Sequence, residues 1–78
     1  MIENNITLKK FIELLQKDHI LDRFGIKRIG IFGSFARGEK YNDIDLLIDD
    51  EKFDYQNIIS FKKYLQEKLN VRIDIMIK

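Results

Sequence analysis

Three aspartates, Asp43, Asp45 and Asp74, interrupt apolar segments of this sequence and are its best candidates for chemistry. Asp43 and Asp45 open the run 43–48 (DIDLLI), and Asp74 stands within the run 71–77 (VRIDIMI). Side chains of a strand alternate between the two faces of a sheet, so Asp43 and Asp45 are expected to share one face. Two carboxylates placed in this way repel each other unless a cation lies between them.

A hard divalent cation satisfies that arrangement, because Mg²⁺ typically binds one or two carboxylates together with the phosphates of a substrate. Asp74, on a neighbouring strand, is a candidate third ligand. Two ions that share the three carboxylates would stabilise the attacking and leaving oxygens of an in-line displacement. The alternative is a solvated sheet face whose acids do no chemistry, and the carboxylates alone leave both interpretations open.

A glycine-containing turn favours the first interpretation. Gly33 and Ser34 directly follow the apolar segment 26–32, and they open a short helical turn that Gly38 ends. Such a turn offers backbone N–H groups and a hydroxyl to a phosphate. Taken alone, a Gly-Ser turn is more often only a tight connection.

Other polar residues have simpler interpretations. Arg37 is a candidate for nucleotide phosphate contact, or else a surface ion-pair partner of Glu39 or Asp43. The only histidine, His19, is assigned to the end of a helix rather than to a metal site. Ser34 is not a hydrolase nucleophile, because no second histidine exists to build a triad beside it.

Charge is concentrated in the middle of the sequence, where residues 39–54 hold seven of the thirteen acidic residues. Asp49, Asp50 and Glu51 within this segment are interpreted as a solvated loop at the edge of a strand. Asp43 and Asp45 differ from them because they interrupt an apolar strand.

Hydrophobic periodicity and turn residues predict the element order α-β-α-β-α-β. The expected elements are a helix from residue 7 to about 19 capped by Thr7 or Asn5, a turn at 22–25, a strand over 26–32, a helical turn over 34–37, a strand over 43–49, a helix that Asp54 caps and Asn70 ends, and a strand over 71–77. This alternation indicates an α/β (α+β) fold, a small mixed sheet of about three strands with helices packed against it.

Apolar residues are expected to form the core between the helices and the sheet. The predicted core side chains are Leu8, Phe11, Ile12 and Leu15 of the first helix, Ile58, Phe61, Leu65 and Leu69 of the last helix, Ile44, Leu46 and Ile48 of the middle strand, and Ile73, Ile75 and Ile77 of the last strand.

Composition limits the remaining possibilities. The 78 residues are expected to form one domain, 1–78, and a chain this small often gains stability as a homo-oligomer. The absence of cysteine excludes disulfides and thiolate metal sites. Fourteen basic and thirteen acidic residues nearly cancel, which argues against nucleic acid as a partner. Residues 1–5 do not resemble a secretory signal and no run is long enough for a membrane span, so a cytoplasmic protein without membrane contact is expected.

Together, the segments 33–38 (GSFARG) and 43–48 (DIDLLI) resemble the signature of the DNA polymerase beta-type nucleotidyltransferase superfamily. The sequence is most similar to the minimal nucleotidyltransferases, many of which are encoded beside a HEPN-domain protein as a toxin–antitoxin pair. The resemblance extends from the first helix through the strand that bears Asp74. It departs from the family pattern at Asn42, where serine is usual.

The resemblance implies a nucleotidyltransferase fold and a role for each motif residue. Gly33 and Ser34 would hold the triphosphate of ATP, and Asp43 and Asp45 would bind two Mg²⁺ ions. Asp74 would bind the catalytic ion and help to deprotonate the attacking hydroxyl. In the antitoxin branch of the family, that hydroxyl belongs to a tyrosine of the HEPN toxin, which the attached AMP silences.

Two other functions are also compatible with the sequence. The first is a non-catalytic antitoxin that masks its toxin by binding, which the end of the sequence four residues after Asp74 favours. The second is a nucleotidyltransferase acting on a small molecule. The short chain argues against that, because it leaves little material for an acceptor pocket.

Overall fold

A three-stranded mixed sheet carries the aspartates in the structure, a computed structural model that describes residues 6–49 and 54–77. The elements in chain order are α1 (Leu8–Lys17), α2 (Ile20–Arg23), β1 (Ile29–Phe32), α3 (Gly33–Ala36), β2 (Asp43–Ile48), α4 (Tyr55–Leu69) and β3 (Arg72–Ile77). The expected sheet and alternation are confirmed, except that the first helical region consists of two helices and the first strand begins at Ile29 rather than at residue 26.

The first helix ends earlier than predicted. Thr7 caps α1, since its side chain accepts a hydrogen bond of 3.2 Å from the backbone N–H of Lys10. The alternative cap, Asn5, lies outside the described residues. His19 has a left-handed backbone with φ 51°, which an α-helix cannot continue, so α1 stops at Lys17. Of the turn expected at 22–25, Asp22 and Arg23 belong to the short helix α2, and Phe24 and Gly25 form the turn, with Gly25 left-handed at φ 69°.

The last helix has both predicted ends. Asp54 caps α4 by accepting a hydrogen bond of 2.9 Å from the backbone N–H of Gln56. Asn70 takes a left-handed conformation, φ 53°, directly after the helix, which short polar side chains tolerate. The loop predicted at Asp50 and Glu51 lies outside the described residues.

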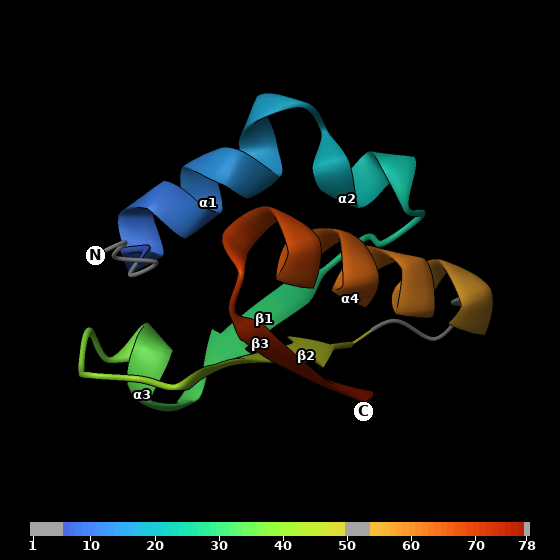
Figure 1. Cartoon of the computed structure of the whole chain (residues 1–78). Helices are drawn as coiled ribbons and strands as arrows, with labels where there is room; N and C mark the ends of the chain where they lie inside the picture. The colour runs from blue at the N-terminus through green and yellow to red at the C-terminus, as the bar shows by residue number, and fades with distance from the viewer. Residues whose placement is uncertain (1–5, 50–53, 78) are drawn as a thin grey trace.

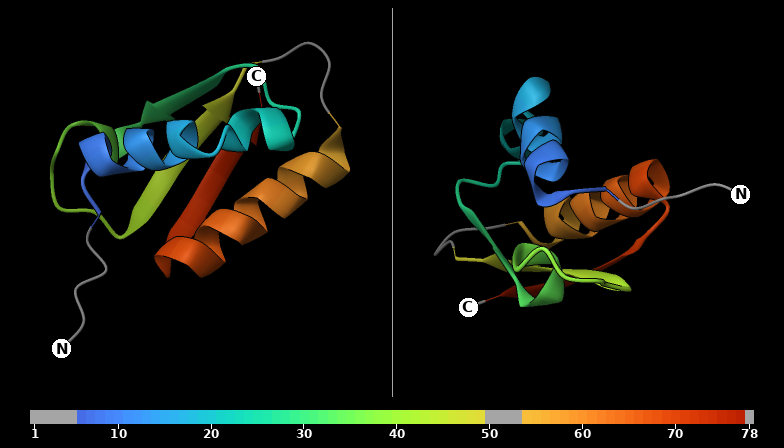
Figure 2. Two further views of the ribbon diagram at one scale, coloured as in Figure 1. Left: turned by 90° about the horizontal axis from the view of Figure 1, so that it is seen from above. Right: turned by 90° about the vertical axis from the view of Figure 1, so that its left-hand side faces the viewer.

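Strand β2 is central, antiparallel to β1 and parallel to β3. A parallel pair needs a long crossover, and α4 supplies it between β2 and β3. Helices α1, α2 and α4 lie over one face of the sheet (Figures 1 and 2). Among the described residues, no helix is long and apolar enough to span a membrane.

Residues of β2 alternate as expected, with Ile44, Leu46 and Ile48 fully buried and Asp43 and Asp45 partly exposed on the other face. The core between the helices and the sheet also contains Phe11, Leu15, Ile20, Ile26, Phe35, Ile58, Phe61, Leu65 and Ile73.

Two residues predicted for the core are exposed. Ile12 is 39% exposed, because α1 directs its neighbour Phe11 inward and leaves Ile12 at the margin of the helix. Ile77 is 38% exposed at the end of the edge strand β3. Leu69 and Ile75, by contrast, are partly buried against the core.

Tyr41 ties the loop before β2 to the segment before α1. Its hydroxyl donates a hydrogen bond to the carbonyl of Ile6 and accepts one from the Ile6 N–H, both at 2.8 Å. Its ring packs against Phe35, which in turn packs against Phe11, with centroid separations of 4.7 Å and 5.4 Å. One side chain thereby fixes α1, α3 and the start of β2 relative to one another.

Replacing Tyr41 with phenylalanine should lower the free energy of unfolding by about 1–2 kcal/mol, because the partly buried backbone groups of Ile6 lose their partner. Chemical denaturation would measure the change. The matched control is Tyr55→Phe, at a tyrosine that is 62% exposed on α4. An equal loss in both variants would contradict the role assigned to the Tyr41 hydroxyl.

Candidate active site

The three aspartates stand on the face of the sheet opposite the helices. Backbone register aligns Asp45 with Phe32 on β1 and with Asp74 on β3, so these three residues form one row across the sheet. Asp43 aligns with Arg72 in the next row. Neighbouring strands are about 4.8 Å apart, which places the side chains of Asp45 and Asp74 next to each other. The prediction that the three acids share one face is therefore confirmed.

The glycine turn meets this row at Asp45. Gly33 follows Phe32 with φ 80°, a conformation that side chains with a Cβ rarely adopt. A Cβ at this position would also overlap Oδ2 of the Asp45 carboxylate. Glycine is thus required at position 33 for two reasons, the left-handed backbone and the carboxylate that would overlap a Cβ.

Ser34 is the second residue of α3 and is partly buried. No side chain caps the start of this helix, so the first N–H groups of the turn have no side-chain acceptor among the described residues. Because Gly33 lies against Asp45, a phosphate bound at the turn would be adjacent to a cation bound at the Asp45 carboxylate.

Arg37 lies at the other end of α3. Its Nε is 3.1 Å from Oε1 of Glu39, and both side chains are more than half exposed. Within residues 6–49 and 54–77, the structure pairs Arg37 with Glu39 and not with Asp43. An exposed pair of this kind contributes little to stability, so Arg37 can exchange Glu39 for another anion at small cost.

The carboxylates suit a divalent ion only in part. No group of three acidic or histidine side chains in the described parts of the chain is close enough to hold one metal ion. Mg²⁺ needs only one or two carboxylates, however, when phosphate oxygens and water complete its octahedron. Neighbouring oxygen donors at Asp45 and Asp74 fit an ion of this type that arrives with a nucleotide.

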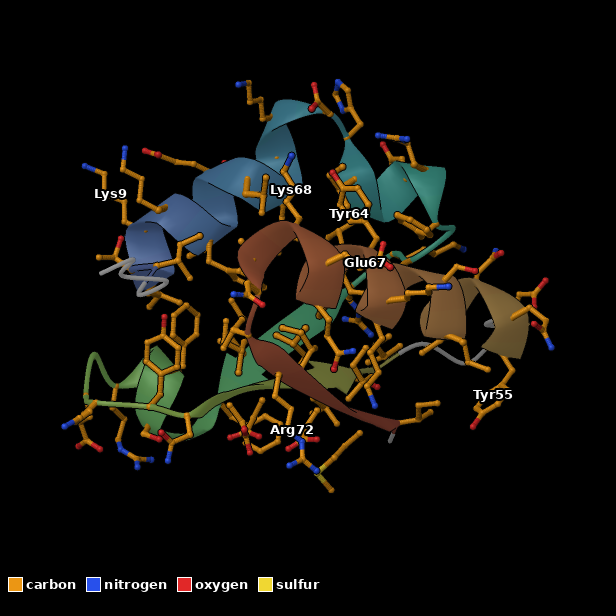
Figure 3. The ribbon with its side chains drawn as sticks, in the orientation of Figure 1. Lys9, Tyr55, Tyr64, Glu67, Lys68 and Arg72 are labelled. Carbon is orange, nitrogen blue, oxygen red and sulfur yellow. The ribbon has the colours of Figure 1, made fainter. Side chains whose placement is uncertain are left out.

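Arg72 belongs to this surface but did not stand out in the sequence. It lies two positions before Asp74, next to Asp43, on the side of the sheet opposite the helices (Figure 3). Its register places a positive charge on the same face of the sheet as the three carboxylates. The alternation that marked Asp74 also indicates Arg72, because residues two apart on a strand share a face.

A pocket of about 320 Å³ lies away from the aspartates, between the start of α1 and the loop after α3. Thr7, Phe35 and Tyr41 contribute to its wall, and none of the three aspartates does. Tyr41 therefore lines a separate hollow. Asp43, Asp45 and Asp74 are partly exposed on the face of the sheet opposite α1, α2 and α4.

Comparison with known proteins identifies the family of this chain. Residues 8–78 match the nucleotidyltransferase domain family, and the chain belongs to it. The chain is 35% identical to the protein adenylyltransferase MntA of Thermococcus cleftensis, over 94% of its own length and 79% of that protein. It is also 35% identical to a protein of Methanocaldococcus jannaschii named as a "putative protein adenylyltransferase", over 92% of this chain and 90% of the relative. No solved structure gives a significant match.

The fold, the match and the relatives agree on a nucleotidyltransferase enzyme. Within that class, the chain is a minimal nucleotidyltransferase.

Gly33→Ala should destabilise the fold by about 2–3 kcal/mol, because a Cβ strains the left-handed backbone and displaces Asp45. Gly38→Ala is the matched control. Gly38 also has a left-handed backbone, φ 74°, but nothing lies within 4 Å of a Cβ there. That variant should lose only about 1 kcal/mol. Denaturant unfolding would compare them, and equal losses would rule out a tight contact between Gly33 and Asp45.

Proposed function

We propose that this protein transfers AMP from ATP to a hydroxyl of a protein acceptor, a tyrosine of a HEPN-domain toxin. The row that joins Asp45 and Asp74, with the Gly33 turn against Asp45, is the observation that carries the proposal. The relative named as a protein adenylyltransferase supports a protein acceptor. The partial exposure of the three carboxylates is compatible with an acceptor of that size.

Each residue has one task in this proposal. Gly33 and Ser34 hold the triphosphate through backbone N–H groups and the hydroxyl, with Arg37 as a further phosphate contact. Asp43, Asp45 and Asp74 hold Mg²⁺, two ions when the nucleotide is bound. When bound there, Mg²⁺ would supply positive charge that neutralises the phosphates.

Asp74 accepts the proton of the acceptor hydroxyl. The acceptor oxygen forms a bond to the α-phosphorus, and the bond between that phosphorus and the bridging oxygen of the β-phosphate breaks. Pyrophosphate leaves and AMP remains on the acceptor. The residues thus position groups and balance charge, which accounts for most catalysis of phosphoryl transfer.

Asp43→Asn should weaken binding of ATP in the presence of Mg²⁺ while leaving metal-free binding of ATP nearly unchanged, since an amide is a poorer ligand for a hard cation. Calorimetry with and without Mg²⁺ would measure both. The control is Asp49→Asn, an acid outside the site that pairs loosely with Arg28 at 3.9 Å. If wild type and Asp43→Asn respond equally to Mg²⁺, Asp43 is not a metal ligand.

Asp74→Asn should reduce transfer of label from α-labelled ATP to a HEPN-domain protein by about 100-fold or more, the usual cost of one lost electrostatic contact at a reacting centre. The substitution keeps the shape of the side chain, so fold and partner binding should persist. It should also abolish neutralisation of the toxin in cells. Full neutralisation by a folded Asp74→Asn protein would instead identify an antitoxin that acts by binding.

A further inference from the structure

The outer edge of β1 is the least protected part of the sheet. Because the strand order is β1-β2-β3, β1 and β3 each have one unpaired side. On β3, the side chain of Gln66 accepts a hydrogen bond of 3.1 Å from the N–H of Ile73, which satisfies one backbone donor of that strand. β1 (Ile29–Phe32) contains neither charge nor proline, and no such side-chain bond reaches it within the described residues. An edge of this kind is a template for another strand.

An apolar groove of about 440 Å³ runs beside this edge. Ile12 and Leu15 of α1 form one wall and Ile29 and Ile31 of β1 form the other. Ile12 is 39% exposed here and extends the apolar surface of the groove onto α1. The groove and the edge are continuous, since Ile29 and Ile31 belong to both.

We infer that a second copy of this chain occupies the groove, by antiparallel pairing of β1 with β1 about a twofold axis at Gly30. Residues directly opposite each other in an antiparallel pair point to the same face of the sheet. A twofold axis between two residues would pair residues of opposite faces, so the axis must pass through one residue of β1. An axis at Gly30 pairs the whole segment 28–32 with itself. An axis at Ile31 would pair Ile29 with Gly33, which has left the strand.

This pairing brings apolar side chains together on one face of the sheet and places a cation on the other face. On the helix side, Ile29 of each copy faces Ile31 of the other, and both cover the groove that Ile12 lines. On the opposite side, Arg28 of each copy faces Phe32 of the other. Phe32 stands between that Arg28 and Asp45 in one row, so the association puts the long guanidinium side chain of one copy within reach of a carboxylate two strands away in the other. Arg28 is free to make that contact, because its pair with Asp49 is long and its side chain is 77% exposed.

Association about Gly30 can be tested by cross-linking, because the chain contains no cysteine. A Cβ at Gly30 would make only an ordinary contact, 3.7 Å from Cβ of Leu47, so Gly30→Cys should fold. Facing Cα atoms of an antiparallel pair are about 4.5–5.5 Å apart, within the range of a disulfide. Mild oxidation should link most of the Gly30→Cys protein into dimers. Ser60→Cys, on the exposed side of α4, should remain largely unlinked.

Sedimentation equilibrium of the purified chain gives the second readout. Ile12→Lys should weaken dimerisation by about 100-fold, since it places a charge in the groove. Ile59→Lys is the matched control, because Ile59 is a 46% exposed isoleucine on α4, away from β1. A wild-type chain that stays monomeric at all concentrations would overturn the inference. So would a dimer that Ile12→Lys leaves intact, or one that both lysine variants weaken equally.

Discussion

The alternation of strand β2 is the constraint on which the rest of the structure depends. Its even-numbered residues, Ile44, Leu46 and Ile48, are fully buried beneath the helices, which fixes Asp43 and Asp45 on the opposite face. A shift of one residue in register would bury both carboxylates and expose the aliphatic side chains. The apolar core therefore holds the acids in place, although α1, α2 and α4 lie over the other face of the sheet. Stability and chemistry in this small protein use opposite faces of one strand.

Around that strand, the other elements each bring one component to the open face. β1 ends at Phe32 and delivers the Gly33 turn onto Asp45, and β3 brings Asp74 and Arg72. These components come from three separate segments, and only the sheet unites them. The turn and the carboxylates thus meet on the face of the sheet opposite α1, α2 and α4.

Local features were predictable from the sequence, whereas features set by distant packing were not. Thr7, Asp54 and Asn70 act within a few residues of their own position, so their capping roles followed from residue type. The exposure of Ile77 follows from its position at the end of the edge strand β3, and the strand order is not recorded in any local pattern. The left-handed turn at His19 was missed because that conformation is uncommon outside glycine.

The candidate site shows the same division. The alternation of the acids correctly gave their shared face, but the alignment of Asp45 with Asp74 required the register between β2 and β3. Gly33 was expected to admit a phosphate, and the structure adds that it admits the Asp45 carboxylate as well. Arg72 was not among the predicted site residues, although it lies two positions before Asp74 and therefore shares its face of the strand.

Placing Asp45 directly beside Asp74 also has a thermodynamic consequence. Like charges opposite each other on neighbouring strands destabilise a sheet, so this row weakens the fold that displays it. A ligand that neutralises the two carboxylates removes this repulsion only in the native state. Binding and folding are then linked, and a ligand at about 100 times its dissociation constant would add about 2.7 kcal/mol to the free energy of unfolding. The concentration of such a ligand would thereby influence how long each molecule survives proteolysis.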